Sequence, residues 1–174
     1  MADFDAFLLD HATAEKKASG MAISMLSHYP DRTELAAAMA DLAIEELTHY
    51  REVLRLIHQR GLITGPDQKD PYVVAFRASS RQGKEVYLLD RLLTASIIEA
   101  RGAERFALVA AALAPGPLKK FYQSIARSEE RHYALFLELA KHYLDDGTIQ
   151  RRWHELLDIE ADIVSKLPIR AALH

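Results

Sequence analysis

Two short motifs in the sequence place a carboxylate and an imidazole at helical spacing. Glu46 and His49 lie three residues apart, and so do Glu129 and His132. Residues at positions i and i+3 of a helix share a face, so each pair can present one oxygen and one nitrogen atom in the same direction. Carboxylates and imidazoles are common ligands of transition metals. The motifs therefore indicate metal chemistry, provided that their faces point into the protein.

The apolar pattern around both motifs predicts that they do. Between residues 31 and 60, and again between 118 and 144, apolar residues recur at alternating spacings of three and four, the pattern of a helix with one buried face. The two faces comprise Leu35, Met39, Leu42, Glu46, His49, Val53 and Leu56, and Leu118, Tyr122, Ile125, Glu129, His132, Phe136, Leu139 and Tyr143. Each Glu-x-x-His pair thus occupies two successive core positions.

Two further predicted helices each carry a single core glutamate. Glu15 lies on the apolar face of residues 4–27, and Glu99 lies on that of residues 84–113. The single glutamates are 84 residues apart, and both members of the Glu-x-x-His motif repeat after 83 residues. Buried carboxylates are costly unless a cation balances them. We therefore predict a duplicated two-metal site with the ligands Glu15, Glu46, His49, Glu99, Glu129 and His132.

The remaining segments complete an all-α prediction. Residues 61–71 read as a loop, a short helix follows within residues 72–81, and a more polar helix covers about 148–167. A chain of 174 residues suits a single domain. The four long helices, one long crossover and paired ligands are similar to the ferritin-like di-metal four-helix bundle. The expected fold is such a bundle with an additional C-terminal helix.

Composition narrows the functional classes. The chain has no cysteine, which excludes disulfides, zinc-thiolate sites and iron-sulfur clusters held by this chain. No signal peptide or membrane span is visible, so a cytoplasmic protein without a membrane partner is expected. The net charge of -3 does not indicate the positively charged surface that is typical of nucleic-acid-binding proteins.

Several nearby residues are predicted to have ordinary roles. Asp31, with Glu34 three residues on, resembles a helix-capping box. Tyr122 is interpreted as a core aromatic residue, with a role in tuning the site or carrying oxidising equivalents as the alternative. Arg131 is interpreted as a charge that supports either the ligands or the structure. The glutamates Glu45, Glu104 and Glu130 lie off the apolar faces and are predicted at the surface, while the histidines His11, His28, His58, His142 and His154 lack a matching partner set.

Four segments of the chain resemble the tRNA isopentenyladenosine hydroxylase family, MiaE. They are LDHATAEKKA (9–18), EELTH (45–49), IEARGAERF (98–106) and FYQSIARSEERHY (121–133). The resemblance implies a non-haem di-iron monooxygenase that uses O2 and external electrons to hydroxylate the isopentenyl side chain of 2-methylthio-isopentenyladenosine in tRNA. Iron suits the carboxylate-rich ligand set, and the ligands alone also allow manganese.

The resemblance also sets expectations for the site and its partners. Glu15 and His49 are expected on one iron and Glu99 and His132 on the other, with Glu46 and Glu129 bridging. Partners would be the modified tRNA and a separate electron-donor reductase, and the chain would be a monomer or a small homo-oligomer. Basic residues that could contact tRNA are Lys16, Lys17, Arg77, Arg81 and Lys84, with Lys119 and Lys120 as further candidates.

Three other functions share part of this pattern. A ferroxidase or iron-storage protein would use the same ligands but assemble into a cage. A small-molecule di-iron oxygenase would use the same metal chemistry without RNA. A metal-free helical interaction module would have core carboxylates that bind no metal. The six residues by themselves do not separate these classes.

Overall fold

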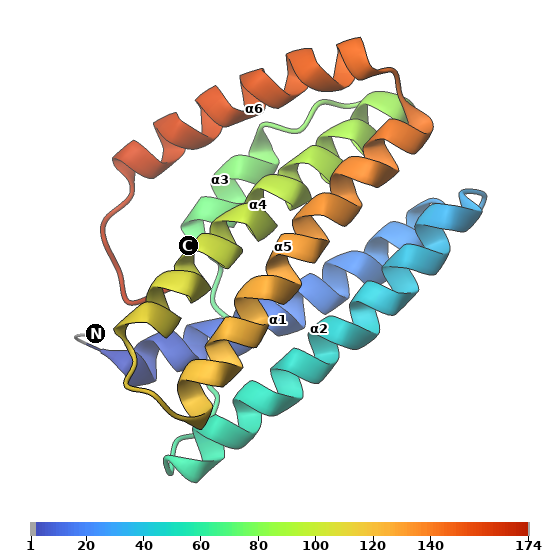
Figure 1. Cartoon of the computed structure of the whole chain (residues 1–174). Helices are drawn as coiled ribbons and strands as arrows, with labels where there is room; N and C mark the ends of the chain where they lie inside the picture. The colour runs from blue at the N-terminus through green and yellow to red at the C-terminus, as the bar shows by residue number, and fades with distance from the viewer. Residues whose placement is uncertain (1–2, 174) are drawn as a thin grey trace. The chain divides into compact units, whose positions relative to one another are not determined.

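The computed structural model describes residues 3–173, and this part of the chain contains helices and no strands. The helices are α1 (Phe4–His28), α2 (Thr33–Gln59), α3 (Pro71–Ala78), α4 (Lys84–Ala112), α5 (Pro117–Tyr143) and α6 (Asp146–Lys166). Figure 1 shows them in chain order. The five long helices begin and end within two residues of the positions expected from the apolar pattern. The expected all-α fold class is therefore correct.

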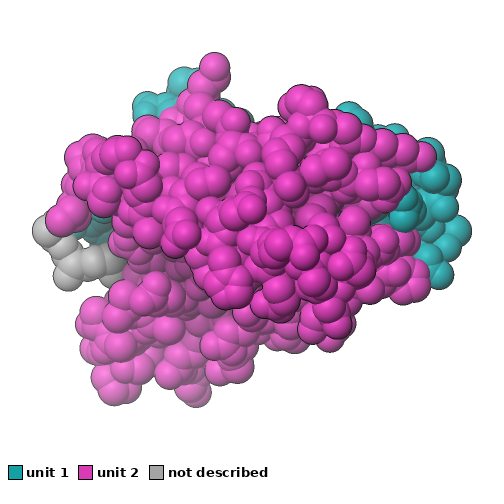
Figure 2. Space-filling model, turned by 90° about the horizontal axis from the view of Figure 1, so that it is seen from above, with its two compact units in different colours: residues 1–68, 170–173 teal, residues 69–169, 174 magenta. Residues whose placement is uncertain are grey.

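The chain divides into two compact units, which Figure 2 distinguishes by colour. The first contains residues 1–68 and 170–173, and the second residues 69–169. A single domain over the whole chain remains a prediction. Each unit contains one pair of long helices, α1 with α2 in the first and α4 with α5 in the second.

The first unit is a helical hairpin whose members are joined by a buried polar contact. Ser19 of α1 donates its hydroxyl to the carbonyl oxygen of Ala43 in α2 at 2.8 Å. Residues after α2 return to α1, where Lys16 Nζ lies 2.6 Å from Asp67 Oδ1 and Lys17 Nζ donates to the carbonyl of Gln68. These contacts fix α1 against α2 and hold the start of the long connection to α1.

The second unit packs α3 and α6 on the α4–α5 hairpin. The Ser96 hydroxyl of α4 donates to the carbonyl of Tyr133 in α5 at 3.0 Å. Tyr72 of α3 donates to Glu160 Oε1 of α6 at 3.2 Å, and Arg101 of α4 donates to the same oxygen at 3.3 Å. Three helices therefore share one carboxylate at this point.

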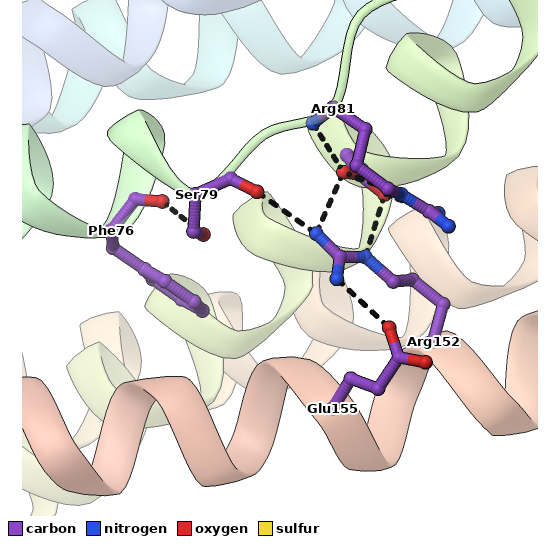
Figure 3. Close-up of polar contacts among 6 residues, drawn as sticks. Phe76, Ser79, Arg81, Arg152 and Glu155 are labelled. Carbon is purple, nitrogen blue, oxygen red and sulfur yellow. Dashed lines mark hydrogen bonds and ion pairs between the residues drawn. The ribbon is translucent and has the colours of Figure 1, made fainter.

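A buried carboxylate fastens the segment between α3 and α4 (Figure 3). Asp90 of α4 is fully buried and accepts hydrogen bonds from the backbone and guanidinium of Arg81 and from the guanidinium of Arg152 in α6. Arg152 also donates to the Ser79 carbonyl and to Glu155. Because both charges are extensively hydrogen-bonded, the pair can be tolerated away from water.

The capping role expected for Asp31 is wrong. α2 begins at Thr33, its N-cap residue is Arg32, and no side chain caps it. Arg32 N donates to the Tyr29 carbonyl at 3.1 Å, so Asp31 lies inside the turn that precedes the helix. The N-cap therefore lies one residue later than the capping-box pattern assumes.

No helix in the described part of the chain combines the length and apolar character needed to cross a bilayer.

Substituting Asp90→Asn is expected to destabilise the protein by about 3 kcal/mol, because the buried Arg152 cation would lose its buried counter-charge and keep only the exposed carboxylate of Glu155. Burial acts to raise the pKa of Asp90, but hydrogen bonds from Arg81 and Arg152 outweigh it and lower the pKa below its usual value. A lowered folded-state pKa contributes stability above the ordinary carboxyl range, about pH 4, and this contribution disappears on further acidification. Urea unfolding at neutral and acidic pH measures both effects.

The matched control is Asp158→Asn, which changes an exposed carboxylate of α6. This variant should unfold like the wild type at neutral pH. Equal stability of the Asp90→Asn variant and the wild type, with the same acid dependence, would show that the buried pair contributes nothing.

Candidate metal centre

The first unit brings three of the predicted ligands together. Glu15 comes from α1, and Glu46 and His49 come from successive turns of α2. One ligand atom from each lies within 4.8 Å of the others. His49 Nδ1 is 3.5 Å from Glu15 Oε2 and 3.7 Å from Glu46 Oε2. The three side chains form what we call the first triad.

The charges of the first triad are strongly coupled. Burial lowers the pKa of His49, but the carboxylates of Glu15 and Glu46 outweigh burial and raise it to about 10. Burial raises the pKa of Glu15, yet hydrogen bonds from His11 and His49 outweigh it and hold this pKa well below its usual value. The two carboxylates thus favour the protonated form of His49, whose single positive charge can balance only one of them.

The second unit brings the other three predicted ligands together in a second triad. Glu99 comes from α4, and Glu129 and His132 come from α5. Their ligand atoms also lie within 4.8 Å of one another, with His132 Nδ1 4.0 Å from Glu129 Oε2. A Cβ atom at Gly102 would lie 3.5 Å from Glu129 Oε2. This distance is an ordinary van der Waals contact, so the Glu129 carboxylate of α5 lies directly beside the α4 backbone at Gly102.

Each triad suits a hard or borderline metal cation by its chemistry. Each contains two carboxylates and one imidazole, and none of the six residues is more than 9% exposed. A protonated imidazole can balance only one of the two negative charges in a triad. A divalent cation would balance both while accepting the nitrogen ligand, and oxygen-rich sets of this kind suit iron or manganese. The donor set thus fits the expected metals.

His11 is a buried neighbour of the first triad that the sequence interpretation missed. Its imidazole is fully buried, and its Nε2 lies 2.6 Å from Glu15 Oε1. The signal was present, because a residue four positions before a core glutamate lies on the same helical face. The repeated Glu-x-x-His pattern does not include position 11, so that pattern gives no indication of this contact.

Other residues occupy positions close to those expected. Glu104 and Glu130 are exposed, whereas Glu45 is half-buried and lies 3.9 Å from His49 Nε2. Tyr122 is buried and packs against Phe106 and Phe121. Arg131 donates to the Arg127 carbonyl and to the buried hydroxyl of Ser128, which is consistent with a structural charge.

The residues considered for tRNA contact fall into two groups. Lys16 and Lys17 hold the segment of Asp67 and Gln68, and Arg81 is committed to Asp90. Arg77 and Lys84 are exposed near the two ends of the connection from α3 to α4. The first group therefore has structural contacts that the sequence did not reveal.

Comparison with known proteins identifies the family. The model of the family described as tRNA-(MS[2]IO[6]A)-hydroxylase (MiaE) matches residues 1–174. The chain belongs to this family. The resemblance recognised in the four helical segments is therefore confirmed, and the two triads can be considered as features of a MiaE family member.

Two curated relatives carry the name tRNA 2-(methylsulfanyl)-N(6)-isopentenyladenosine(37) hydroxylase. The protein from Pseudomonas putida is 38% identical over 151 residues, which are 87% of this chain and 73% of the relative. The protein from Salmonella typhimurium is 33% identical over 134 residues, which are 75% of this chain and 48% of the relative. The match thus spans about half the length of the second relative.

A solved structure shares the fold. Protein 43 with aldehyde deformylating oxygenase activity from Synechococcus is 33% identical, with a TM-score of 0.90 over 98% of this chain and 86% of that chain. This likeness confirms the ferritin-like fold class expected from the sequence.

Substituting Glu46→Ala or Glu129→Ala is expected to abolish metal loading, because each change removes a carboxylate from one triad and leaves too few oxygen ligands. Metal analysis of the purified protein after anaerobic incubation with Fe2+ and desalting measures the bound iron per chain. Circular dichroism establishes that each variant remains helical.

Glu130→Ala is the matched control, because Glu130 is adjacent to Glu129 but exposed. This variant should retain the iron content of the wild type. Wild-type iron content in both the Glu46→Ala and the Glu129→Ala variants would exclude the two triads as the metal site.

Proposed function

We propose that this chain is an O2-dependent di-iron hydroxylase of the isopentenyl side chain of 2-methylthio-isopentenyladenosine in tRNA. The observation that carries the proposal is the pair of buried triads, each built from one Glu and one Glu-x-x-His, in a chain that the MiaE model matches throughout. The substrate follows from the names of the two curated relatives. A cytoplasmic location is part of the proposal, because the proposed substrate is a tRNA.

We further propose that the six triad residues together hold two iron ions. Glu15 and His49 would bind one ion, Glu99 and His132 the other, and Glu46 and Glu129 would be shared between them. The near-equal sequence offsets between the halves support this assignment, because a duplicated helix pair presents equivalent ligands from each copy.

When bound, the iron ions would supply the activation of O2, a reaction that side chains alone do not perform. The overall reaction converts a C–H group, O2, two electrons and two protons into a C–OH group and water. The protein residues hold the ligands in fixed rotamers on long helices and keep bulk water away from them. Both triads meet this requirement, since their members are buried.

The two electrons must come from another molecule. The chain contains no cysteine, so it cannot hold an iron-sulfur cluster through thiolates. A separate reductase is therefore part of the proposal, as is a monomer or small oligomer that leaves a surface accessible to both tRNA and reductase. We retain as tRNA contacts Arg77 and Lys84, which are exposed, and leave out Lys16, Lys17 and Arg81 because their side chains hold structural contacts.

A small-molecule oxygenase is the second candidate. The solved structure with the same fold has aldehyde deformylating oxygenase activity, and its likeness extends over nearly all of this chain. A fold and its metal ligands do not by themselves select the substrate. A ferroxidase is distinguished by its assembly, because a cage elutes far ahead of a monomer or dimer in gel filtration.

The function is tested by incubating the iron-loaded protein with a reductase system, O2 and tRNA that carries the 2-methylthio-isopentenyl modification. Digestion to nucleosides followed by mass spectrometry should show a modified nucleoside that has gained one oxygen atom. Labelled O2 should place the label in the product, because a monooxygenase takes the inserted atom from O2.

The matched control is the Glu129→Ala variant, which retains the surface of the protein but lacks one triad carboxylate. It should give no product. If the wild-type protein contains reduced iron but the nucleoside gains no oxygen atom, the tRNA activity is contradicted and the small-molecule candidate is favoured.

A further inference from the structure

The His11 imidazole contacts the back of the first triad. His11 is one turn before Glu15 on α1, and both side chains are buried. The 2.6 Å contact joins His11 Nε2 to Glu15 Oε1. Both residues lie inside a regular 25-residue helix, so the backbone fixes the spacing of the pair.

The chemistry of the contact sets its direction. An ionised carboxylate can only accept hydrogen bonds, so Nε2 of His11 carries the proton and donates it to Oε1. The other oxygen of Glu15, Oε2, lies 3.5 Å from His49 Nδ1, on the ligand side of the triad. The two oxygens of Glu15 therefore have different tasks, one toward His11 and one toward the ligands.

The second triad has no imidazole at the equivalent position. Glu99 follows Glu15 by 84 residues, and the same offset from His11 leads to Ala95. Ala95 is buried on α4 one turn before Glu99, and its methyl group cannot donate a hydrogen bond. The duplicated ligand set is thus supported differently in the two units.

We propose that His11 is a positioning residue that holds Glu15 Oε1 away from the metal and presents Oε2 alone, so that the two metal positions are chemically inequivalent. This inference rests on the metal site of the proposed function. It assigns single-oxygen binding to Glu15, and it leaves Glu99 without the corresponding restraint.

Loss of the hydrogen bond between His11 and Glu15 is expected to weaken metal binding. Hydrogen-bond partners behind a metal ligand fix its orientation, and their removal typically weakens metal binding about 10- to 100-fold. Only the affinity of the metal position bound by Glu15 should change, because Ala95 provides no hydrogen-bond donor for Glu99 at the other position. A change confined to one of two binding steps is a readout that a general loss of packing would not produce.

The test is a titration of the metal-free protein with Co2+, followed by calorimetry and by visible absorption, which reports the coordination of the ion. The variants are His11→Leu, which removes the donor, and His11→Gln, whose amide nitrogen can donate from a similar reach. His28→Leu is the matched control, because His28 is an exposed histidine of the same helix that contacts the Ser24 carbonyl at 2.7 Å.

The wild type and His28→Leu should bind two Co2+ ions with the same affinities and spectra. His11→Leu should still bind two ions, with one step weakened about 10- to 100-fold and a changed absorption spectrum. His11→Gln should recover most of the lost affinity and the wild-type spectrum. Two wild-type steps in His11→Leu, or no recovery in His11→Gln, would overturn the positioning role while leaving the metal site intact.

A crystal structure of the Co2+-loaded wild type tests the same inference without relying on a variant that folds. It should show Glu15 bound through Oε2 only, with Oε1 still accepting from His11. Glu15 bound through both oxygens, or His11 turned away, would refute the inference alone. A wild type that binds no Co2+ would refute the metal site of the proposed function and the inference together.

Discussion

The cost of burying carboxylates is the constraint on which the rest of this structure depends. Each unit buries two glutamates beside one histidine, and none of these side chains can reach bulk water to any useful extent. An imidazolium neutralises one carboxylate at most, so each triad retains a demand for positive charge. The raised pKa of His49 expresses that demand in the first unit. A bound cation is the simplest way to satisfy it.

Hydrogen bonds between the helices hold the buried carboxylates in place. Ser19 joins α1 to α2, and Ser96 joins α4 to α5, each through a hydroxyl that donates to a backbone carbonyl. In the second unit, Asp90 and Glu160 connect α4 with α6. Such contacts restrict sliding and rotation of the helices, which would otherwise move the triad atoms apart.

The comparisons separate the metal chemistry from the choice of substrate. A solved oxygenase with aldehyde deformylating activity shares the fold, whereas the family model and the curated relatives point to tRNA. A shared fold therefore does not by itself select the substrate. The net charge of -3 means that any attraction to tRNA comes from local basic residues and not from the molecule as a whole.

Much of the fold, and the burial of the six candidate ligands, could be predicted from the sequence alone. The alternation of three and four determines which face of each helix is buried, so it identified Glu15 and Glu99 as well as both Glu-x-x-His pairs. The helix limits followed from Pro, Gly and the ends of the apolar pattern. One exception was the start of α2, where the turn backbone and not the Asp31 side chain decides the boundary. Another was α6, which begins at Asp146, two residues before the expected position.

Other features required the tertiary structure, because they depend on contacts between residues that no local pattern links. The roles of Lys16 and Lys17 depend on a chain segment about fifty residues away that folds back onto α1, and that of Arg81 depends on Asp90 being enclosed with Arg152. His11 is different, since helical spacing allowed a contact with Glu15 and only the side-chain conformation decided it. The sequence by itself determined the types of ligand and the faces that carry them. The tertiary structure decided which polar side chains support those ligands, because hydrogen bonds form only where folding brings donors and acceptors to within about 3 Å.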